Sequence, residues 1–360
     1  MTSRVWLALP LIGALLLAYF ASRPAQGCCP APRRGQPVVN ADQTVILIWD
    51  AASKTEHFIR QASFKSEAED FSFLVPSPSQ PELEESGNEA FGFLLKLTEP
   101  EVKKVRQPSG GMGCGCGSDA GSKDKAATAP AKVRVLEEKL VAGFNAVVLE
   151  ADSTTALVDW LKTNGYAFSP EVEAWAKPYI ESGWKITALK VAKTKDRIED
   201  KTVTASALRM SFKTDRPLFP YREPDYKKSA QDLGARSRLL RIYFVGESRY
   251  QGDLTADDPW TGRVAWAGKL RANDREKTLE LLKLPDKSTP PEWWLTEFED
   301  EWPYKVAPAD VYFSRSSDQK EVRRPPIYEY VSLPYPTDAM TYALGAVILL
   351  PLVWRRLRRA

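Results

Sequence analysis

The chain has 360 residues, of which 43% are hydrophobic and 27% are charged, and its 50 basic and 47 acidic residues give a formal net charge of +3. This length and composition agree with globular folding into one large or two ordinary domains. Six of the basic residues are arginines in the two end segments, and without them 44 basic residues remain against 47 acidic ones. The body of the chain is therefore slightly acidic, which argues against DNA or RNA as a partner.

Residues 1–27 have the pattern of a secretory signal peptide. A short basic region ends at Arg4, an apolar run covers residues 5–20, and polar or small residues lead to Gly27. As a helix this run would reach only about 24 Å, less than the ~30 Å hydrocarbon core of a bilayer. We therefore expect cleavage after Gly27, so that the mature chain begins at Cys28 outside the cytoplasm. A lipid attached to the Cys28 thiol is an alternative anchor.

Residues 28–106 are predicted to form a β-rich first part of the ectodomain. Apolar and mixed runs predict strands at Thr44–Asp50, Glu56–Phe64 and Phe71–Val75, and their short connections favour an antiparallel meander. A helix is expected at Glu89–Leu97. Residues 107–131 differ in composition, because they are rich in glycine and alanine and are typical of a linker or an exposed loop.

Residues 132–322 are predicted to be the main part of the ectodomain. Ser153 can cap a helix that runs to Lys162, and a second helix is expected over Pro170–Glu181. Strands that are grouped apart from a helical pair indicate an α+β fold, mostly antiparallel sheet. Beyond Asp253 the residue pattern that predicts strands and helices becomes weaker. The predicted strands are Val133–Leu140, Phe144–Ala151, Trp184–Ala192, Val203–Lys213 and Leu239–Gly246.

The C-terminal end has the pattern of a membrane anchor. Residues 323–338 contain four prolines and are predicted to form a stalk, and residues 339–354 are almost entirely apolar. Because basic residues stay on the cytoplasmic side, we expect one transmembrane helix with residues 355–360 as a cytoplasmic tail. A buried helix and a sorting signal that is later removed are alternatives. The arginines that set this topology are Arg355, Arg356, Arg358 and Arg359.

The four cysteines form two close pairs, Cys28 with Cys29 and Cys114 with Cys116. Cysteines of an exported chain are usually oxidised, and bridges within such close pairs are strained, so we expect two disulfides between the pairs. The alternative is a thiol-redox or metal-binding site made of the same four thiols, although their spacing does not match common structural zinc sites. We expect no cofactor.

Tryptophans and carboxylates are concentrated in residues 253–302. Such a segment can form a sugar-binding platform or flank the acid pair of a carbohydrate-active enzyme, although large aromatic side chains more often fill cores. The single histidine, His57, lies in a predicted strand, where a Ser-His-Asp triad through it is only formally possible. Motifs of hydrolases, phosphate-binding loops and zinc proteases are absent from the sequence. The tryptophans are Trp260, Trp266, Trp293, Trp294 and Trp302.

Several stretches together resemble the bacterial family called domain of unknown function 2330. They are Cys28-Cys29-Pro30 after the signal, FSFLVPSPSQPE at 71–82, Gly-Cys-Gly-Cys at 113–116, LVDWLKTNGY at 157–166, YIESGWKITALK at 179–190 and LRMSFKTDRPLFPYRE at 208–223. These stretches cover most of the ectodomain in the right order. The resemblance implies an exported bacterial protein and brings no catalytic residues with it.

The sequence therefore predicts a membrane-anchored envelope protein with its ectodomain outside the cytoplasm, in the periplasm or the extracellular space. We expect a non-catalytic binding or interaction module whose partner is an envelope protein or a cell-wall polymer. The alternatives are a thiol-redox or metal-binding protein built on the four cysteines, and a carbohydrate-active enzyme built on residues 253–302.

Overall fold

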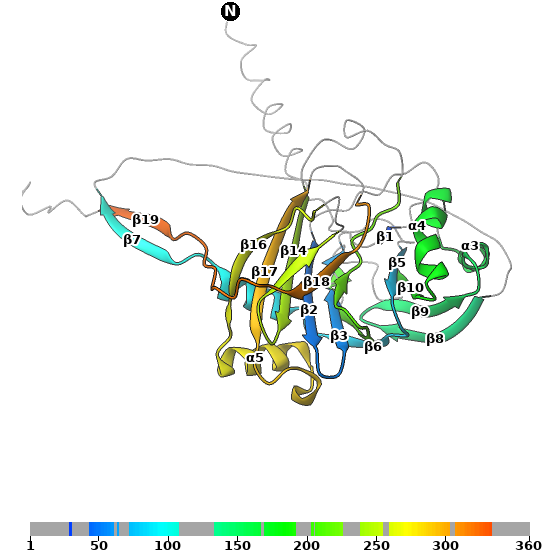
Figure 1. Ribbon diagram of the computed structural model, residues 1–360, viewed down its shortest axis with the longest axis horizontal. Helices are drawn as coiled ribbons and strands as arrows, with labels where there is room; N and C mark the ends of the chain where they lie inside the picture. Colours follow the sequence, from blue (N-terminus) through cyan, green and yellow to red (C-terminus); the bar gives the residue numbers. More distant parts are fainter. Residues whose placement is uncertain are drawn as a thin grey trace, which may run out of the picture. The chain divides into compact units, whose positions relative to one another are not determined.

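The chain divides into two compact units, one made of Met1–Glu99 and Cys116–Arg324 and the other of Pro100–Gly115 and Pro325–Ala360. Figure 1 shows the elements of both in a computed structural model. The described residues are 29–30, 43–60, 63–64, 72–107, 133–166, 169–191, 203–204, 206–225, 238–254, 259–302 and 307–332.

A seven-stranded sheet, called the large sheet here, forms the centre of the first unit. Every neighbouring pair of its strands is antiparallel except β14 and β2, which are parallel. In spatial order the strands are β16 (Arg263–Lys269), β17 (Trp294–Trp302), β14 (Arg238–Gly246), β2 (Gln43–Asp50), β3 (Thr55–Arg60), β12 (Ala207–Lys213) and β6 (Glu82–Ser86).

Strand β2 is an almost continuous apolar run because both of its faces are covered. Val45, Leu47 and Trp49 belong to the core on one face, and Ile46 and Ile48 to the core on the other. Since side chains of a strand alternate between faces, each neighbouring strand contributes to both cores in the same way.

Two helices, α2 (Glu89–Thr98) and α5 (Ala272–Leu282), cover the Ile46 face of the large sheet. The 3-10 turn η2 (Asp286–Ser288) follows α5. The guanidinium of Arg209 in β12 donates to the carbonyl oxygens of Leu282 and Lys283, at 3.3 and 3.1 Å. A buried arginine of the sheet thereby satisfies carbonyl groups at the end of α5, where a positive charge is favourable.

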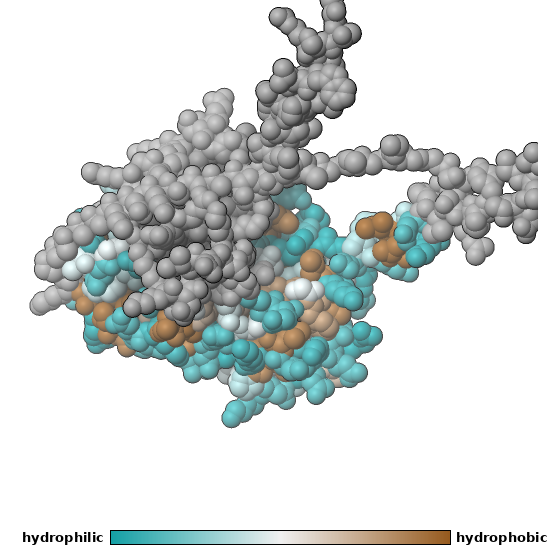
Figure 2. Space-filling view, turned by 180° about the vertical axis from the view of Figure 1, so that it is seen from behind, coloured by the Kyte–Doolittle hydropathy of each residue, from teal (hydrophilic) through white to brown (hydrophobic). Residues whose placement is uncertain are grey.

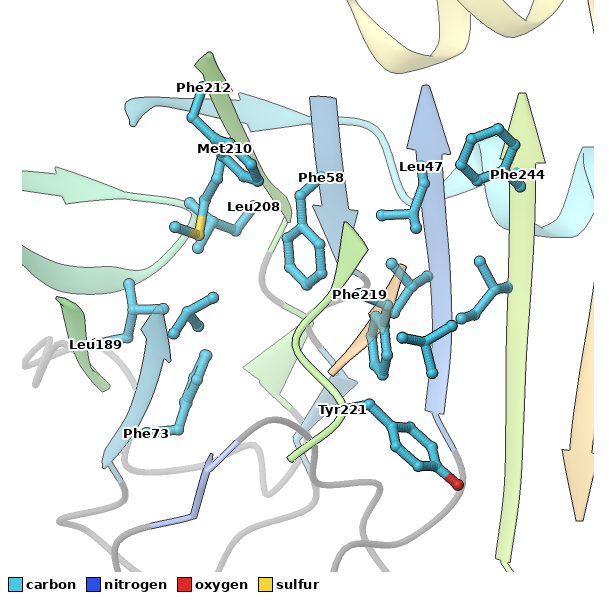
Figure 3. Packing of buried hydrophobic residues seen from close by; sticks show 14 of the residues in the cluster. Leu47, Phe58, Phe73, Leu189, Leu208, Met210, Phe212, Phe219, Tyr221 and Phe244 are labelled. Carbon is cyan, nitrogen blue, oxygen red and sulfur yellow. The ribbon is translucent and has the colours of Figure 1, made fainter. Parts of the chain in front are cut away.

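Two smaller sheets contribute to the core on the opposite face of the large sheet. The larger of the two is called the flanking sheet here. Figure 3 shows its residues Phe73 and Leu189 beside Leu208 and Met210 of β12. The flanking sheet has the antiparallel order β1 (Cys29–Pro30), β5 (Ser72–Ser77), β10 (Lys185–Val191), β9 (Phe144–Ala151) and β8 (Val133–Val141). The short sheet has the order β13 (Leu218–Phe219), β18 (Val311–Arg315) and β15 (Tyr250–Asp253).

Helices α3 (Thr154–Thr163) and α4 (Pro170–Glu181) pack on the other face of the flanking sheet. Ser153 caps α3 by accepting a hydrogen bond from the backbone N–H of Ala156 at 3.1 Å, and Ser169 caps α4 in the same way. The predicted capping by Ser153 and the predicted bounds of α4 are confirmed. The first unit is thus built of four layers, in the spatial order helices, sheet, sheet and helices.

Two pairs of strands lie outside these sheets. The first unit contains the short antiparallel pair β4 (Ser63–Phe64) and β11 (Val203–Thr204). In the second unit, β7 (Val102–Gln107) pairs in parallel with β19 (Ile327–Ser332). Neither β7 nor β19 was expected from the sequence, which predicted a stalk for residues 323–338.

The α+β class with mixed and antiparallel sheets is confirmed. The predicted meander of three strands is wrong in its third member, because only β2 and β3 pair, while β5 pairs with β10 of the flanking sheet. Strands β16, β17 and β18 and helix α5 follow Asp253, where the sequence pattern was weak. Among the described residues no helix is long and apolar enough to cross a bilayer. Residues 1–27 and 339–354 lie outside the described ranges.

Glu56 in β3 joins the large sheet to the short one. Its Oε2 atom accepts a hydrogen bond from the backbone N–H of Leu218 at 2.9 Å, and the side chain is fully buried. The Oε1 atom has no hydrogen-bond partner among the described residues. Burial therefore raises the pKa of the Glu56 carboxyl to about 8, only partly offset by the Leu218 bond.

Replacing Glu56 should change how stability depends on pH. The unfolded carboxyl ionises near its ordinary pKa of 4.5, whereas the folded one stays protonated up to about pH 8. Stability conferred by this group is complete below pH 4.5 and is lost as the pH rises to about 8. Between pH 5 and pH 9 the free energy of unfolding of the unmodified protein should therefore fall by an amount on the order of 4 kcal/mol. We expect this fall to be absent in Glu56→Gln, as measured by denaturant unfolding. Identical pH dependence in the two proteins would show that Glu56 ionises normally.

Candidate functional site

The acidic strand β17 divides its carboxylates between the two faces of the large sheet. Glu297 lies opposite Tyr243 of β14, whose side chain belongs to the core beneath α2 and α5. Phe298 belongs to the core on the other face. Because side chains alternate, Glu299 shares the face of Glu297, and Asp300 shares the face of Phe298.

Glu297 and Glu299 form a cluster with three arginines, called here the arginine–glutamate cluster. Arg241 of β14 and Arg263 of β16 lie directly opposite Glu299 on either side of β17. The third arginine, Arg324, follows β18. Together these five residues are Arg241, Arg263, Glu297, Glu299 and Arg324.

Both carboxylates of the cluster contact more than one guanidinium. Glu299 Oε1 accepts from Arg241 Nη2 and from Arg324 Nη2, both at 2.8 Å, and its Oε2 accepts from Arg263 Nη2 at 2.6 Å. Glu297 Oε1 lies 2.7 Å from Arg324 Nη2 and 2.9 Å from Arg241 Nε. Bonds of this kind between ions are short and strong, and they fix the positions of both partners.

Burial and ion pairing act in opposite directions on the two carboxyl groups. For Glu299, burial alone would raise the pKa, but hydrogen bonds from Arg324 and Arg241 outweigh it and bring the pKa to about 2. Glu297 is fully buried, and burial raises its pKa by more than the neighbouring Arg324 lowers it. The pKa values of two neighbouring carboxyl groups are thus moved apart, a feature that is also found in acid-base sites.

The cluster also ties β17 to the end of helix α2. Arg324 Nε donates to the carbonyl oxygen of Thr98 at 3.0 Å, and Thr98 is the last residue of α2. A guanidinium at this end of a helix satisfies a free carbonyl and interacts favourably with the helix dipole. The charges therefore hold three strands and one helix in a fixed arrangement.

Asp300 is the centre of a second polar group on the opposite face. It accepts hydrogen bonds from the Tyr221 hydroxyl at 2.6 Å, the Trp260 indole at 3.1 Å and the Thr261 hydroxyl at 2.6 Å. Burial, with a further contribution from Asp300, raises the pKa of Tyr221. The Asp300 carboxylate is fully buried, and these three donors replace water around it.

The predicted platform tryptophans lie on both sides of the large sheet. Trp266 and Trp293 are buried in the core beneath α2 and α5, whereas Trp260 packs against the opposite core. The space beside Trp260 is filled closely, because a Cβ atom on Gly252 would come within 2.3 Å of its ring. Trp294 is partly buried, and the Trp302 side chain lies outside the described residues.

His57 links β3 to a neighbouring strand and to η2. Its Nε2 atom lies 2.9 Å from the carbonyl oxygen of Ser288, and its Nδ1 atom lies 2.8 Å from Ser211 Oγ. Since a carbonyl can only accept, Nε2 carries the proton of the neutral ring, and Nδ1 accepts from Ser211. Burial lowers the pKa of His57, so the ring is neutral at pH 7. In a catalytic triad a carboxylate accepts the proton of the imidazole and orients the ring. In this protein a backbone carbonyl, that of Ser288, has this position.

Of the four cysteines, only the backbone of Cys29, in β1, is described. The predicted disulfides and the alternative thiol site therefore lie outside the described residues, as do the arginines after residue 354. Where side chains are described, no group of three or more His, Cys, Asp or Glu residues is arranged to hold a metal ion.

The carboxylates of β17 could be recognised in the sequence as an acidic group, but the residues that bind them could not. Glu297 and Glu299 are two positions apart, a spacing that places charges on one face of a strand. Their arginines come from two neighbouring strands and from the segment after β18, so only the fold brings them together. No local pattern identifies Tyr221 as a partner of Asp300.

Removing one arginine of the cluster should destabilise the protein strongly. Arg324→Leu leaves Glu297 and Glu299 with fewer charged partners in a buried position, which typically costs about 3 to 5 kcal/mol. The matched control is Arg271→Leu, because Arg271 is 81% exposed and, among the described residues, forms an ion pair with Asp274 alone, at the start of α5. We expect the control to lose less than about 1 kcal/mol in denaturant unfolding. Equal losses in the two variants would mean that the cluster contributes no more than a surface pair.

Comparison with known proteins gives a family and a distant structural similarity. No curated protein matches the chain. Among solved structures the chain is similar to the crystal structure of baculovirus P35, with 9% identity, a TM-score of 0.30, and coverage of 80% of this chain and 96% of that chain. A TM-score this low supports no argument about fold or function. A family model described as "Uncharacterized protein conserved in bacteria (DUF2330)" matches residues 23–314. This range includes every stretch on which the resemblance was based, and the chain therefore belongs to the DUF2330 family.

Proposed function

We propose that this protein is a membrane-anchored binding or interaction module of the bacterial envelope, with its folded body outside the cytoplasm. The observation that carries the non-catalytic part is the bonding of three of its chemically capable side chains. Glu299 is surrounded by arginines, Asp300 by three donors, and both ring nitrogens of His57 by polar atoms of the protein. These groups connect strands, helices and turns, so their hydrogen bonding serves the fold.

The location rests on the sequence. An apolar run at residues 5–20 precedes the body, and a second at residues 339–354 follows it and is bordered by arginines. A cleaved signal and a retained C-terminal span place the folded body outside and residues 355–360 inside. Membership of a bacterial family is consistent with an envelope location.

The topology can be tested with reporter fusions in a bacterial host. A fluorescent protein that folds only in the cytoplasm should be bright when fused after Ala360, and a phosphatase active only outside should be active when fused after Pro336. Replacing the four arginines at positions 355, 356, 358 and 359 by asparagine should weaken this orientation, since it removes the charges that stay inside. Phosphatase activity after Ala360, or recovery of the intact protein in the cytosolic fraction, would refute the topology.

The non-catalytic assignment has its own test. Purified protein should not turn over panels of chromogenic esters and glycosides above the rate without protein. The most informative variants are Ser211→Ala, which removes the hydroxyl beside His57, and Glu299→Gln, which removes the ionised carboxylate. Turnover by the unmodified protein that either variant abolishes, while its circular dichroism spectrum is unchanged, would show that the protein is an enzyme.

A further inference from the structure

The paired strands β7 and β19, called here the ribbon, carry large apolar side chains in contact with solvent. Val102, Ile327 and Tyr328 are 56%, 55% and 52% exposed. Figure 2 shows apolar residues of the ribbon next to hydrophilic ones. Two weak ion pairs accompany them, Lys103 with Glu101 at 3.4 Å and Lys104 with Glu329 at 3.6 Å.

A ribbon of this kind is poorly suited to water. Parallel strands in proteins almost always have both faces covered, and two-stranded assemblies alone are marginally stable. Val102 and Ile327 lie side by side on the ribbon, and adjoining exposed apolar side chains are typical of a surface that another body covers. The ribbon thus calls for an environment that shields it.

The exposed residues lie on both faces of the ribbon. Val102 and Ile327 are partners in the register and share one face. Tyr328 is the next residue along the chain, so its side chain points to the other face. A folded protein partner with a flat surface would cover one face only, whereas a layer into which the ribbon dips would surround both.

The chain places the ribbon near the proposed membrane span. Parallel pairing puts Gln107 and Ser332 at the same end of the ribbon. Ala339, where the apolar segment begins, is seven residues after Ser332. A chain of that length spans at most about 25 Å, so this end of the ribbon must lie within that distance of the bilayer if residues 339–354 cross it.

We propose that the ribbon inserts its exposed apolar side chains into the headgroup layer of the membrane, an inference that rests on the proposed C-terminal span. Tyrosine is favoured in this layer because its ring is apolar and its hydroxyl is polar. Lys103 and Lys104 can extend their ammonium groups to lipid phosphates. Since Glu101 and Glu329 offset much of that charge, the apolar side chains supply most of the contact.

Photo-cross-linking in the full-length protein tests the insertion. A photoreactive phenylalanine analogue is incorporated at position 328, 327 or 140, one position at a time, in cells whose lipids carry a clickable fatty acid. Leu140 is the control, because it is 68% exposed but lies on β8 of the first unit. We expect lipid adducts at 328 and at 327 to exceed those at 140 severalfold, since the two faces of the ribbon share one environment.

Other outcomes separate this inference from the proposed function. A chain that resists carbonate extraction but gives no excess of lipid adducts at 327 and 328 overturns the insertion and leaves the membrane anchor intact. Protein adducts at these positions in place of lipid adducts would identify a protein partner and overturn it as well. Lipid adducts from only one of the two positions contradict insertion of both faces. A chain found in the soluble fraction overturns both the anchor and the insertion.

Discussion

Strand β2 must be covered on both faces, and this requirement organises the first unit. Its central residues are fully buried, with Ile46 and Ile48 on one side and Val45 and Leu47 on the other. One sheet can satisfy such a strand only if a separate layer lies on each side. Helices α2 and α5 form one layer, and the flanking and short sheets contribute to the other. The flanking sheet then needs its own cover, which α3 and α4 provide.

Covering both faces has a consequence for the carboxylates that are buried in the large sheet, because water does not reach them there. A buried carboxylate then needs donors from the protein, or it must hold its proton. The structure contains both solutions. Glu299 is ionised among arginines, and Asp300 is held by three donors, whereas the pKa of Glu56 is raised to about 8. The residue types that sequence reasoning associates with catalysis are here the residues that a doubly covered sheet has to satisfy internally.

The same constraint explains which features could be predicted. Helices α3 and α4 carry local signals, serine caps and an opening proline, which do not depend on the rest of the fold. Pairing of β14 with β2 and of β5 with β10 joins residues far apart in sequence, and short connections near β2 and β3 gave a misleading meander. Strand β17 was missed because its alternating charges look exposed when the neighbouring arginines are unknown. The tryptophans were recognised as a group, but Trp266 and Trp293 belong to one core, whereas Trp260, which precedes β16, packs against the other.

The ribbon also depends on residues that are far apart in the sequence, and this bears on the order in which the chain folds. Its strands begin at Val102 and Ile327, with nearly all of the first unit's sequence after α2 between them. If the chain is exported as proposed, β7 emerges from the membrane before β19 and has no partner until β19 arrives, which is the last strand before the proposed span. Long-range pairs of this kind form late because a large loop must be closed. We therefore expect the ribbon to form after the elements that lie between its strands and, in the proposed topology, beside the membrane.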